Sequence, residues 1–260
     1  MEYLEGTVNH ITILRERSMK NVRDHIRNIA IIAHVDHGKT TLVDKLLEQS
    51  GTLDSEKMTD RVMDSNDIER ERGITILAKN TGITKGDYHI NIVDTPGHAD
   101  FGGEVERTLQ MVEGFLLLVD AAEGVLPGTR FVLQKALALN LRPIVFINKV
   151  DRKDADIPAT EELIHELFLD LATDDGHLDF PILYGSGKLG FASTDPNAPS
   201  DSMEPLFDAI INSIPAPQER EPGALQMLVT NIDHSDFLGT IAVGRMLSGT
   251  LNTGDQFIYC

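Results

Sequence analysis

One short segment of the chain, AHVDHGKT at residues 33–40, has the residue types and spacing that phosphate binding requires. It follows an apolar run, opens a helix-like segment, and matches the P-loop pattern except that Ala33 replaces the usual glycine. Backbone N–H groups around Gly38 suit a β-phosphate, Lys39 places a positive charge between the β- and γ-phosphates, and the Thr40 hydroxyl can bind Mg²⁺. We therefore expect a nucleoside triphosphate site with Mg²⁺ as its cofactor and with Lys39 acting in catalysis. The nucleotide-binding residues expected in this segment are Asp36, His37, Gly38, Lys39, Thr40 and Thr41.

A second motif, DTPGH at residues 94–98, stands at the end of another apolar run. The carboxylate of Asp94 can hold Mg²⁺ through a water molecule, and the N–H group of Gly97 can reach the γ-phosphate. Asp-x-x-Gly strings are common in turns, so the motif gains its weight from its position after a P-loop and a strand. We expect Asp94 to be a metal ligand and Gly97 to sense the γ-phosphate.

A third motif, NKVD at residues 148–151, can distinguish guanine from adenine. An ionised Asp151 accepts hydrogen bonds from guanine N1–H and the exocyclic amine, and adenine offers neither group in that place. The stem of Lys149 can cover the plane of the base. A fourth element, GSGK at residues 185–188, can supply a backbone N–H group to the guanine oxygen. The expected base-binding residues are Asn148, Lys149, Asp151, Ser186, Gly187 and Lys188.

A long polar stretch from Gly51 to Thr75 ends in the string RGITI at residues 72–76. A loop of that length without structure of its own is usually functional or disordered. Thr75 is placed to give Mg²⁺ a second hydroxyl when a γ-phosphate is present. The stretch is therefore predicted to be a switch, with Thr75 sensing the γ-phosphate and serving as a metal ligand.

These motifs need a framework that places the ends of several strands side by side. Apolar, β-rich runs predict buried parallel strands at residues 29–33, 89–93, 115–119, 144–147 and 182–184, with an antiparallel partner at 76–84. Helix-like segments lie between them at residues 40–49, 103–113, 129–139, 158–171 and 203–214. This alternation predicts an α/β fold, the doubly wound and mostly parallel sheet of a P-loop NTPase G domain.

The chain is expected to divide into four segments. Residues 1–26 have mixed charge and no apolar signal-peptide core, which predicts a poorly ordered leader, and Met19 could be the true start. Residues 27–216 are expected to form the G domain, and the proline-containing residues 217–222 a stiff linker. Residues 223–260 contain short strand-like runs punctuated by glycines, which predict an antiparallel β-barrel. Fewer than 40 residues are too few to close a barrel, so we expect this second domain to be incomplete.

The composition limits the classes of protein that fit. The formal net charge is −18, and residues 151–222 contribute −12 of it, from 16 acidic and 4 basic side chains. An acidic face of this kind repels phosphate, so any contacts with RNA are expected elsewhere in the protein. No apolar run approaches the roughly 18 residues that a membrane span requires, and the single cysteine, Cys260, permits no intrachain disulfide. We therefore expect a cytoplasmic protein without a membrane partner.

Together, the strings AHVDHGKTT, RGITI, DTPGH and NKVD resemble the translational GTPases, the superfamily of elongation factors Tu and G. The longer strings AHVDHGKTTLVDKLL, RVMDSNDIERERGITILAKNT and NIVDTPGHADFGGEVER look most like the BipA/TypA family, ribosome-associated GTPases implicated in large-subunit assembly and stress adaptation. The resemblance runs from about Asn28 to Cys260. It implies a monomeric enzyme that hydrolyses GTP to GDP and phosphate and is stimulated by the ribosome. Its contacts with rRNA and ribosomal proteins would lie mainly in regions outside this sequence.

The resemblance also implies roles for individual residues. His98 would orient the attacking water and be catalytic, and Val35 with Ile74 would form an apolar gate that holds His98 back. Asp36 in such factors can help to bind a monovalent cation near the phosphates. One departure is Gly187, which stands where the family commonly has alanine.

Two other interpretations remain open. The chain could be a different translational GTPase, such as elongation factor G, the back-translocase LepA or a tetracycline-protection protein. His37 and the string at residues 64–71 favour the BipA/TypA family instead. The chain could also be a GTP-gated module that docks on the ribosome without hydrolysing GTP, although the presence of His98 and Thr75 argues against this.

Overall fold

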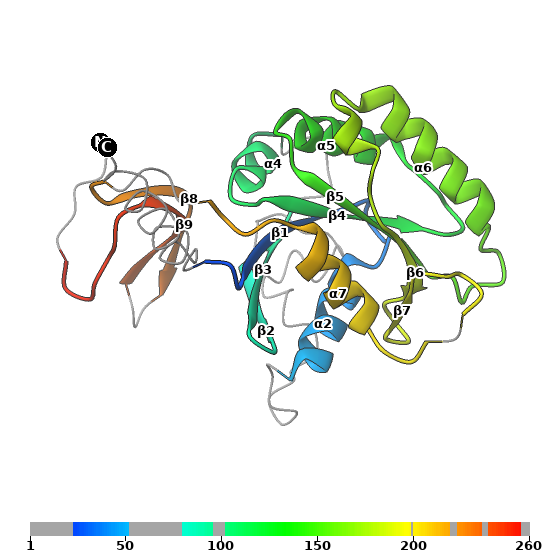
Figure 1. Cartoon of the computed structure of the whole chain (residues 1–260), viewed down its shortest axis with the longest axis horizontal. Coiled ribbons are helices and arrows are strands. Elements are labelled where there is room, and N and C mark those ends of the chain that lie inside the picture. Colours follow the sequence, from blue (N-terminus) through cyan, green and yellow to red (C-terminus); the bar gives the residue numbers. More distant parts are fainter. Residues whose placement is uncertain are drawn as a thin grey trace, which may run out of the picture.

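The core of the protein is a seven-stranded sheet with strand order β2-β3-β1-β4-β5-β6-β7 (Figure 1). The computed structural model describes residues 23–51, 80–95, 102–198, 200–218, 223–235 and 239–255. The strands of this sheet are β1 (Ile26–Ala33), β2 (Asn80–Lys85), β3 (Tyr88–Asp94), β4 (Gly114–Asp120), β5 (Arg142–Asn148), β6 (Ile182–Ser186) and β7 (Phe191–Ser193). The inner strands pair in parallel, whereas β2 and β7 run antiparallel at the two edges. The predicted, mostly parallel sheet is confirmed.

Helices cover both faces of the sheet (Figure 1). They are α2 (Lys39–Ser50), α4 (Gly102–Leu109), α5 (Pro127–Ala138), α6 (Ile157–Leu171) and α7 (Glu204–Ser213), with a 3-10 turn η3 (Asp175–His177) after α6. The buried side chains of α2 and α7 share one core with the sheet, and those of α4, α5 and α6 share the other. None of the helices in the described ranges has both the length and the hydrophobicity to cross a bilayer. The fold is therefore doubly wound, as the sequence predicts.

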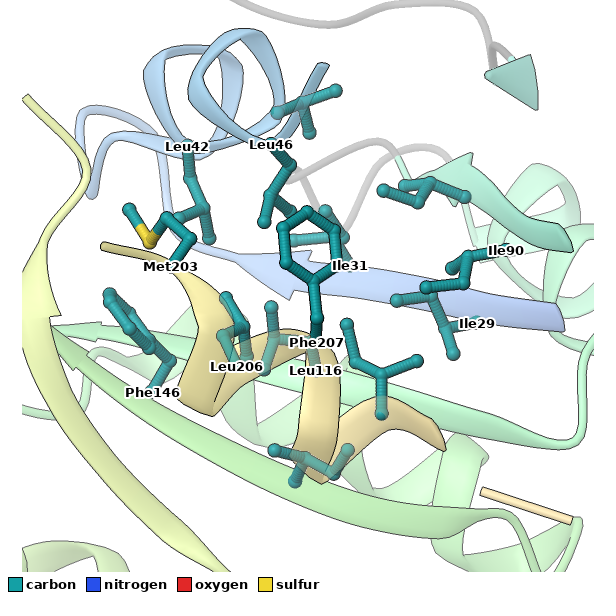
Figure 2. Packing of buried hydrophobic residues seen from close by; sticks show 14 of the residues in the cluster. Ile29, Ile31, Leu42, Leu46, Ile90, Leu116, Phe146, Met203, Leu206 and Phe207 are labelled. Carbon is teal, nitrogen blue, oxygen red and sulfur yellow. The ribbon is translucent and has the colours of Figure 1, made fainter. Parts of the chain in front are cut away.

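The central strands are apolar on both sides because they serve both cores. Every residue of β4 is buried. Its side chains alternate, so that Leu116 lies in the core beside α2 and α7, whereas Phe115 and Leu117 lie in the core on the other face. Figure 2 shows the first core, in which Leu42 of α2 and Phe207 of α7 pack against the sheet. This burial on both faces is why the strands appear in the sequence as unbroken apolar runs.

Local sequence sets the ends of the helices that matter for the site. Gly38 (φ 91°) precedes α2 and Gly51 (φ 73°) follows it, both in the left-handed region that favours glycine. Asp156 caps α6 by accepting a hydrogen bond from the Ala159 N–H group at 3.1 Å, and Pro158 lies in the first turn. Helix α2 thus begins directly at the P-loop, without an intervening linker.

Three elements refine the sequence-based prediction. The helix predicted at residues 103–113 ends at Leu109, because the N–H group of Glu113 instead donates to the Asn28 carbonyl oxygen at 3.1 Å beside the sheet. The antiparallel strand predicted at residues 76–84 is confirmed from Asn80 onward, where β2 runs to Lys85, while residues 76–79 lie outside the described part of the chain. Strand β7 has no counterpart in the prediction, since three residues are too few to give a periodic signal.

The C-terminal part contains a separate antiparallel pair, β8 (Gln226–Ser235) and β9 (Gly239–Ser248). Arg245 of β9 forms an ion pair with Glu113 and donates to the Gln110 carbonyl oxygen at 3.3 Å, so the pair contacts the segment that precedes β4. Two strands do not make a barrel, and the predicted barrel stays a prediction.

Candidate nucleotide-binding site

Four predicted motifs stand where a parallel strand ends, at one edge of the sheet. The P-loop follows β1, while Asp94, Asn148 and Ser186 end β3, β5 and β6. In open parallel sheets the carboxyl edge of the strands is where ligands bind. The fold therefore gathers motifs from four distant parts of the sequence at one place.

The backbone of the P-loop is shaped to receive an anion. Asp36 (φ 66°) and Gly38 (φ 91°) both adopt left-handed conformations. A Cβ atom on Gly38 would lie 2.6 Å from Asn148 Nδ2, so only glycine fits there. No side chain caps the N-terminus of α2, whose first turn contains Thr40 and Thr41. The N–H groups of that turn and the helix dipole favour a phosphate at this point.

Lys39, the first residue of α2, reaches the end of β3. Its Nζ atom lies 2.7 Å from Asp94 Oδ1 and donates to the Thr95 carbonyl oxygen at 2.5 Å. Both Asp94 and Thr95 are buried, and the Thr95 hydroxyl donates to the Ile31 carbonyl oxygen at 2.6 Å. The predicted phosphate ligand and the predicted metal ligand are therefore in direct contact, on a strand end fixed against β1.

The oxygen atoms at this point fit Mg²⁺. Asp94 offers a carboxylate at the end of β3, and Thr40 offers a hydroxyl from the first turn of α2. Mg²⁺ prefers such hard oxygen ligands and usually completes its shell with water and substrate phosphates. Within the described part of the chain, no group of three or more His, Cys, Asp or Glu side chains could hold a metal by itself. This pattern suits an ion that shares its ligands with a nucleotide.

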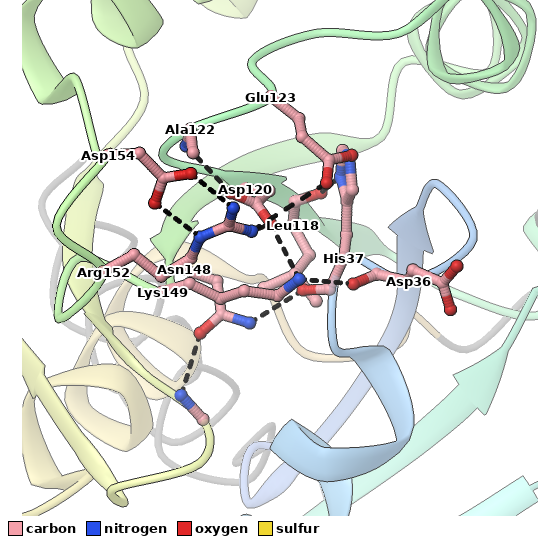
Figure 3. Close-up of polar contacts among 11 residues, drawn as sticks. Asp36, His37, Leu118, Asp120, Ala122, Glu123, Asn148, Lys149, Arg152 and Asp154 are labelled. Carbon is pink, nitrogen blue, oxygen red and sulfur yellow. Dashed lines mark hydrogen bonds and ion pairs between the residues drawn. The ribbon is translucent and has the colours of Figure 1, made fainter.

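Asn148 joins the P-loop to the loop predicted to contact guanine (Figure 3). Its Nδ2 donates to the His37 carbonyl oxygen and its Oδ1 accepts from the Gly187 N–H group, both at 2.8 Å. The neighbouring Lys149 has φ 61°, and its Nζ donates to the Asp36 carbonyl oxygen at 2.6 Å. The first, third and fourth motifs thus form one hydrogen-bonded unit.

The loop predicted to contact guanine, called the guanine loop below, is the tight turn at residues 186–190 between β6 and β7. Ser186 is buried, its hydroxyl accepts from the Leu189 N–H group at 3.2 Å, and its carbonyl oxygen accepts from Gly190 N–H at 2.8 Å. A Cβ atom on Gly187 would lie 3.3 Å from Leu42 Cα, which is a tight contact. Gly187, which stands where the family commonly has alanine, therefore lies directly against α2.

Comparison with known families agrees with this geometry. The elongation factor Tu GTP binding domain family matches residues 24–216, most of the chain. The chain belongs to this family. The predicted translational GTPase resemblance and the predicted G-domain fold are both confirmed.

Several relatives carry the description "Large ribosomal subunit assembly factor BipA". The chain is 54% identical over 239 residues to that of Bacillus subtilis (strain 168), 54% over 234 residues to that of Salmonella typhimurium, and 55% over 232 residues to that of Synechocystis sp.. The matches cover 89–90% of this chain but 39% of each relative. They bear out the resemblance to BipA/TypA and give the other translational factors no better support.

Solved structures share the same fold. A protein from Thermus thermophilus superposes with a TM-score of 0.67 at 19% identity, over 89% of this chain and 47% of that one. Elongation factor SelB from Methanococcus maripaludis, in complex with the GTP analogue GppNHp, gives 0.65 at 24% identity, over 88% and 43%. At these identities the likeness concerns the fold alone.

Asp120 borders these motifs, and the sequence analysis did not identify it. It ends β4 and is fully buried, with Oδ2 2.7 Å from Lys149 Nζ and 3.3 Å from Arg152 Nη1 (Figure 3). Its Oδ1 accepts from the Ala122 N–H group at 2.8 Å. Burial alone would raise the pKa of the Asp120 carboxyl, but the hydrogen bonds from Lys149 and Ala122 outweigh it and hold the pKa below its usual range. An ionised Asp120 therefore fixes the Lys149 side chain.

The side chain of His37 is directed toward the end of β4 and the segment that follows it. It is fully buried, with Nδ1 3.3 Å from the Leu118 carbonyl oxygen and Nε2 3.7 Å from Glu123 Oε2. Burial lowers the pKa of His37, and the nearby His34 lowers it further, against the opposing effect of the Leu118 hydrogen bond. The imidazole is accordingly neutral, so any phosphate contact by His37 would involve its main chain.

The remaining predicted site residues fall into two groups. Asp151 and Lys188 are exposed beside the loops that Asn148 joins, where a base could reach them. Thr75, Gly97 and His98, together with Ile74 of the predicted gate, lie outside the described residues. Their roles stay predictions.

Proposed function

We propose that this chain is the GTP-binding part of a BipA-type ribosome-assembly factor, and that it acts as a Mg²⁺-dependent switch that hydrolyses GTP to GDP and phosphate. The observation that carries the proposal is the Asn148 side chain, which joins the P-loop main chain to the guanine loop. Loops linked in this way present a phosphate site and a base site at a fixed separation. The similarity to BipA proteins supports the ribosomal role.

The described residues would divide the work of binding as follows. Lys39 and the N–H groups of α2 take the β- and γ-phosphates, and Asp151 accepts the two donors of guanine. Thr40 would hold Mg²⁺ directly and Asp94 would hold it through a water molecule, and the ion would screen the phosphate charge. Asp36 is the proposed contact of a monovalent cation.

Besides Lys39, hydrolysis is assigned to residues outside the described ranges. His98 would orient the attacking water, while Thr75 and the Gly97 N–H group would sense the γ-phosphate. The ribosome would stimulate the reaction by allowing His98 to reach the water.

The wider setting is part of the same proposal. Residues 27–216 form the GTP-binding domain and residues 223–260 the first part of a second, barrel-like domain. The factor works as a cytoplasmic monomer, without a membrane partner. Because the chain spans 39% of the length of its BipA relatives, the contacts with rRNA and ribosomal proteins are assigned mainly to the remainder of such a protein.

Two measurements on the purified chain test the proposal. Displacement of a fluorescent GDP derivative by GDP, GTP and ATP should give strong preference for the two guanine nucleotides. Phosphate release under multiple-turnover conditions should be slow for the chain alone. Equal displacement by ATP would refute guanine recognition, and the absence of turnover by a full-length BipA-type protein with ribosomes would favour a non-hydrolysing docking module.

A further inference from the structure

The last turn of α2 contains a glutamine whose amide connects two segments distant in sequence. Gln49 Nε2 donates to the Gly190 carbonyl oxygen at 2.6 Å, and its Oε1 accepts from the Met203 N–H group at 2.7 Å. The side chain is half-buried, and both ends of its amide are used. One side chain thus ties helix α2 to the guanine loop and to the residue before α7.

The hydrogen bond from Gln49 reaches the guanine loop at Gly190. It has φ +82°, and its N–H group donates to the Ser186 carbonyl oxygen at 2.8 Å, which closes the turn. A Cβ atom on Gly190 would lie 2.9 Å from Gln49 Nε2, so the glutamine amide packs directly on the loop backbone. Moving Gly190 would open the turn that begins at Ser186.

The other end of the loop is also held. The Gly187 N–H group donates to Asn148 Oδ1 at 2.8 Å, and the Gly187 backbone lies tightly against Leu42 of α2. The turn is therefore attached to β5 at one end through Asn148 and to α2 at the other through Gln49. Because α2 begins at Lys39, one rigid helix positions both the phosphate-binding lysine and the guanine loop.

We propose that Gln49 is a positioning residue for guanine recognition, which holds the backbone N–H groups of residues 186–188 toward the O6 atom of the base. This rests on the proposed function, because it assumes that the turn contacts guanine. Gln49 itself would not touch the nucleotide. The experiment must exclude one alternative, in which Gln49 has a purely structural role and only anchors α7 through Met203.

Two variants separate these roles. Gln49→Glu keeps an oxygen that can accept from the Met203 N–H group but places a second carboxylate oxygen against the Gly190 carbonyl, so it removes the loop contact selectively. Gln49→Leu removes both hydrogen bonds at similar length. Gln134→Glu is the matched control, because Gln134 is an exposed glutamine of α5 and lies on the opposite face of the sheet from α2.

The measurement is the Kd of each variant for GDP and for 6-thio-GDP, in which a weaker acceptor replaces O6 while N1–H and the 2-amine are kept. The loss of one hydrogen bond predicts about a fivefold to tenfold weaker affinity for GDP in both Gln49 variants. The affinity for 6-thio-GDP should fall by less, so the preference for GDP over 6-thio-GDP should shrink. Gln134→Glu should keep both values.

Three outcomes decide the matter. Equal losses for the two nucleotides would show that Gln49 does not act through O6 and would overturn the proposal. Unchanged GDP affinity in Gln49→Glu, with a folded far-UV spectrum, would overturn it as well. If Gln49→Leu does not fold, Gln49→Glu decides alone, because it preserves the Met203 contact. Failure of the unaltered chain to prefer GDP over ADP would instead refute the proposed function.

Discussion

The Nζ atom of Lys39 lies 2.7 Å from the Oδ1 atom of Asp94, so the group expected to neutralise phosphate pairs with the group expected to hold Mg²⁺. The two side chains are 10% and 3% exposed. A pair this well shielded is weakly screened by water. On binding of a nucleotide with Mg²⁺, Lys39 would therefore leave Asp94 to pair with phosphate, and Asp94 would help to hold the hydrated metal ion.

This change of partners predicts that Asp94→Asn affects nucleotide binding differently with and without Mg²⁺. Without the carboxylate, Lys39 loses its competing partner, so the affinity for GDP measured in EDTA should be kept or should rise. The Mg²⁺-dependent part of GTP affinity should fall by about tenfold, because the metal loses a charged contact. Displacement titrations with and without Mg²⁺ measure both, with Asp87→Asn in the exposed β2–β3 turn as control. Equal weakening under both conditions would indicate a structural role for Asp94.

Asp151→Asn should change the preferred base. The new amide donates where the carboxylate accepted, so GTP affinity should fall by a factor on the order of 10⁴. Xanthosine triphosphate, whose 2-oxo group accepts that donor, should bind in its place. Competition between the two nucleotides measures the switch, and Lys153→Ala, exposed two residues away, should keep guanine preference. A variant that still prefers GTP would place base recognition elsewhere.

Asp120 should contribute to stability through Lys149. Replacing Asp120 by alanine leaves the Lys149 ammonium without its buried acceptor, which should lower the free energy of unfolding by about 1–3 kcal/mol. Urea unfolding measures this difference. Asp154→Ala is the control, because Asp154 also pairs with Arg152 but is exposed. A change no larger than that of the control would show that the buried pair is energetically neutral.

The pKa of Asp120 gives this contribution a pH dependence. Because the pKa is lowered in the folded state, the stabilisation is fully present above the ordinary Asp pKa of about 4 and is lost as the pH falls through the folded value. The difference in free energy of unfolding between the unaltered chain and Asp120→Asn should therefore be constant from about pH 5 to about pH 7 and shrink below about pH 4. A difference that grew on acidification would contradict the sign.

The sequence identifies most of the residues that the fold gathers at the candidate site, because the chemistry restricts the residue types. Phosphate, Mg²⁺ and guanine each demand particular groups, and Lys39, Asp94 and Asn148 all follow apolar runs that identify the strand ends. Asp120 could have been identified by the same pattern, because it is the aspartate at the end of the apolar run GFLLLVD. Its partner cannot be read from that run, because Lys149 meets it only when β4 and β5 pair in parallel.

Gln49 shows the limit of sequence reasoning more clearly. Its position near the end of an amphipathic helix predicts nothing more than a polar surface residue. Its contacts with Gly190 and Met203 depend on how the β6–β7 turn and α7 fold back over α2, which no local pattern encodes. Residues whose role is to position another segment are therefore the ones that sequence analysis misses here.

Removal of the predicted water-orienting group should affect turnover and not binding. In a full-length BipA-type protein, His98→Ala should keep GTP affinity nearly intact, while ribosome-stimulated hydrolysis falls by roughly 10² to 10⁴. Phosphate release with and without ribosomes measures the effect. His165→Ala, on the exposed face of α6, is a control that should retain stimulation. Full stimulated turnover in His98→Ala would assign catalysis to another residue.

The stretch from Gly51 to Thr75 should respond to the γ-phosphate. It contains few large apolar residues among many charges, so it cannot bury enough surface to offset the entropy of ordering. With GTP, the Thr40 and Thr75 hydroxyls would share Mg²⁺ with the γ-phosphate, and a charge-assisted contact contributes on the order of 1.5–3 kcal/mol. GDP offers no such contact to Thr75.

Hydrogen exchange and limited proteolysis should therefore show the stretch protected with a non-hydrolysable GTP analogue and exposed with GDP. Thr75→Ala should abolish this difference and leave GDP affinity nearly unchanged, because GDP does not use Thr75. Thr84→Ala on the edge strand β2 is the matched control, and it should keep the nucleotide-dependent difference. Equal protection of the unaltered chain with the GTP analogue and with GDP would mean that this stretch is not the switch, whatever the affinity of the site for guanine.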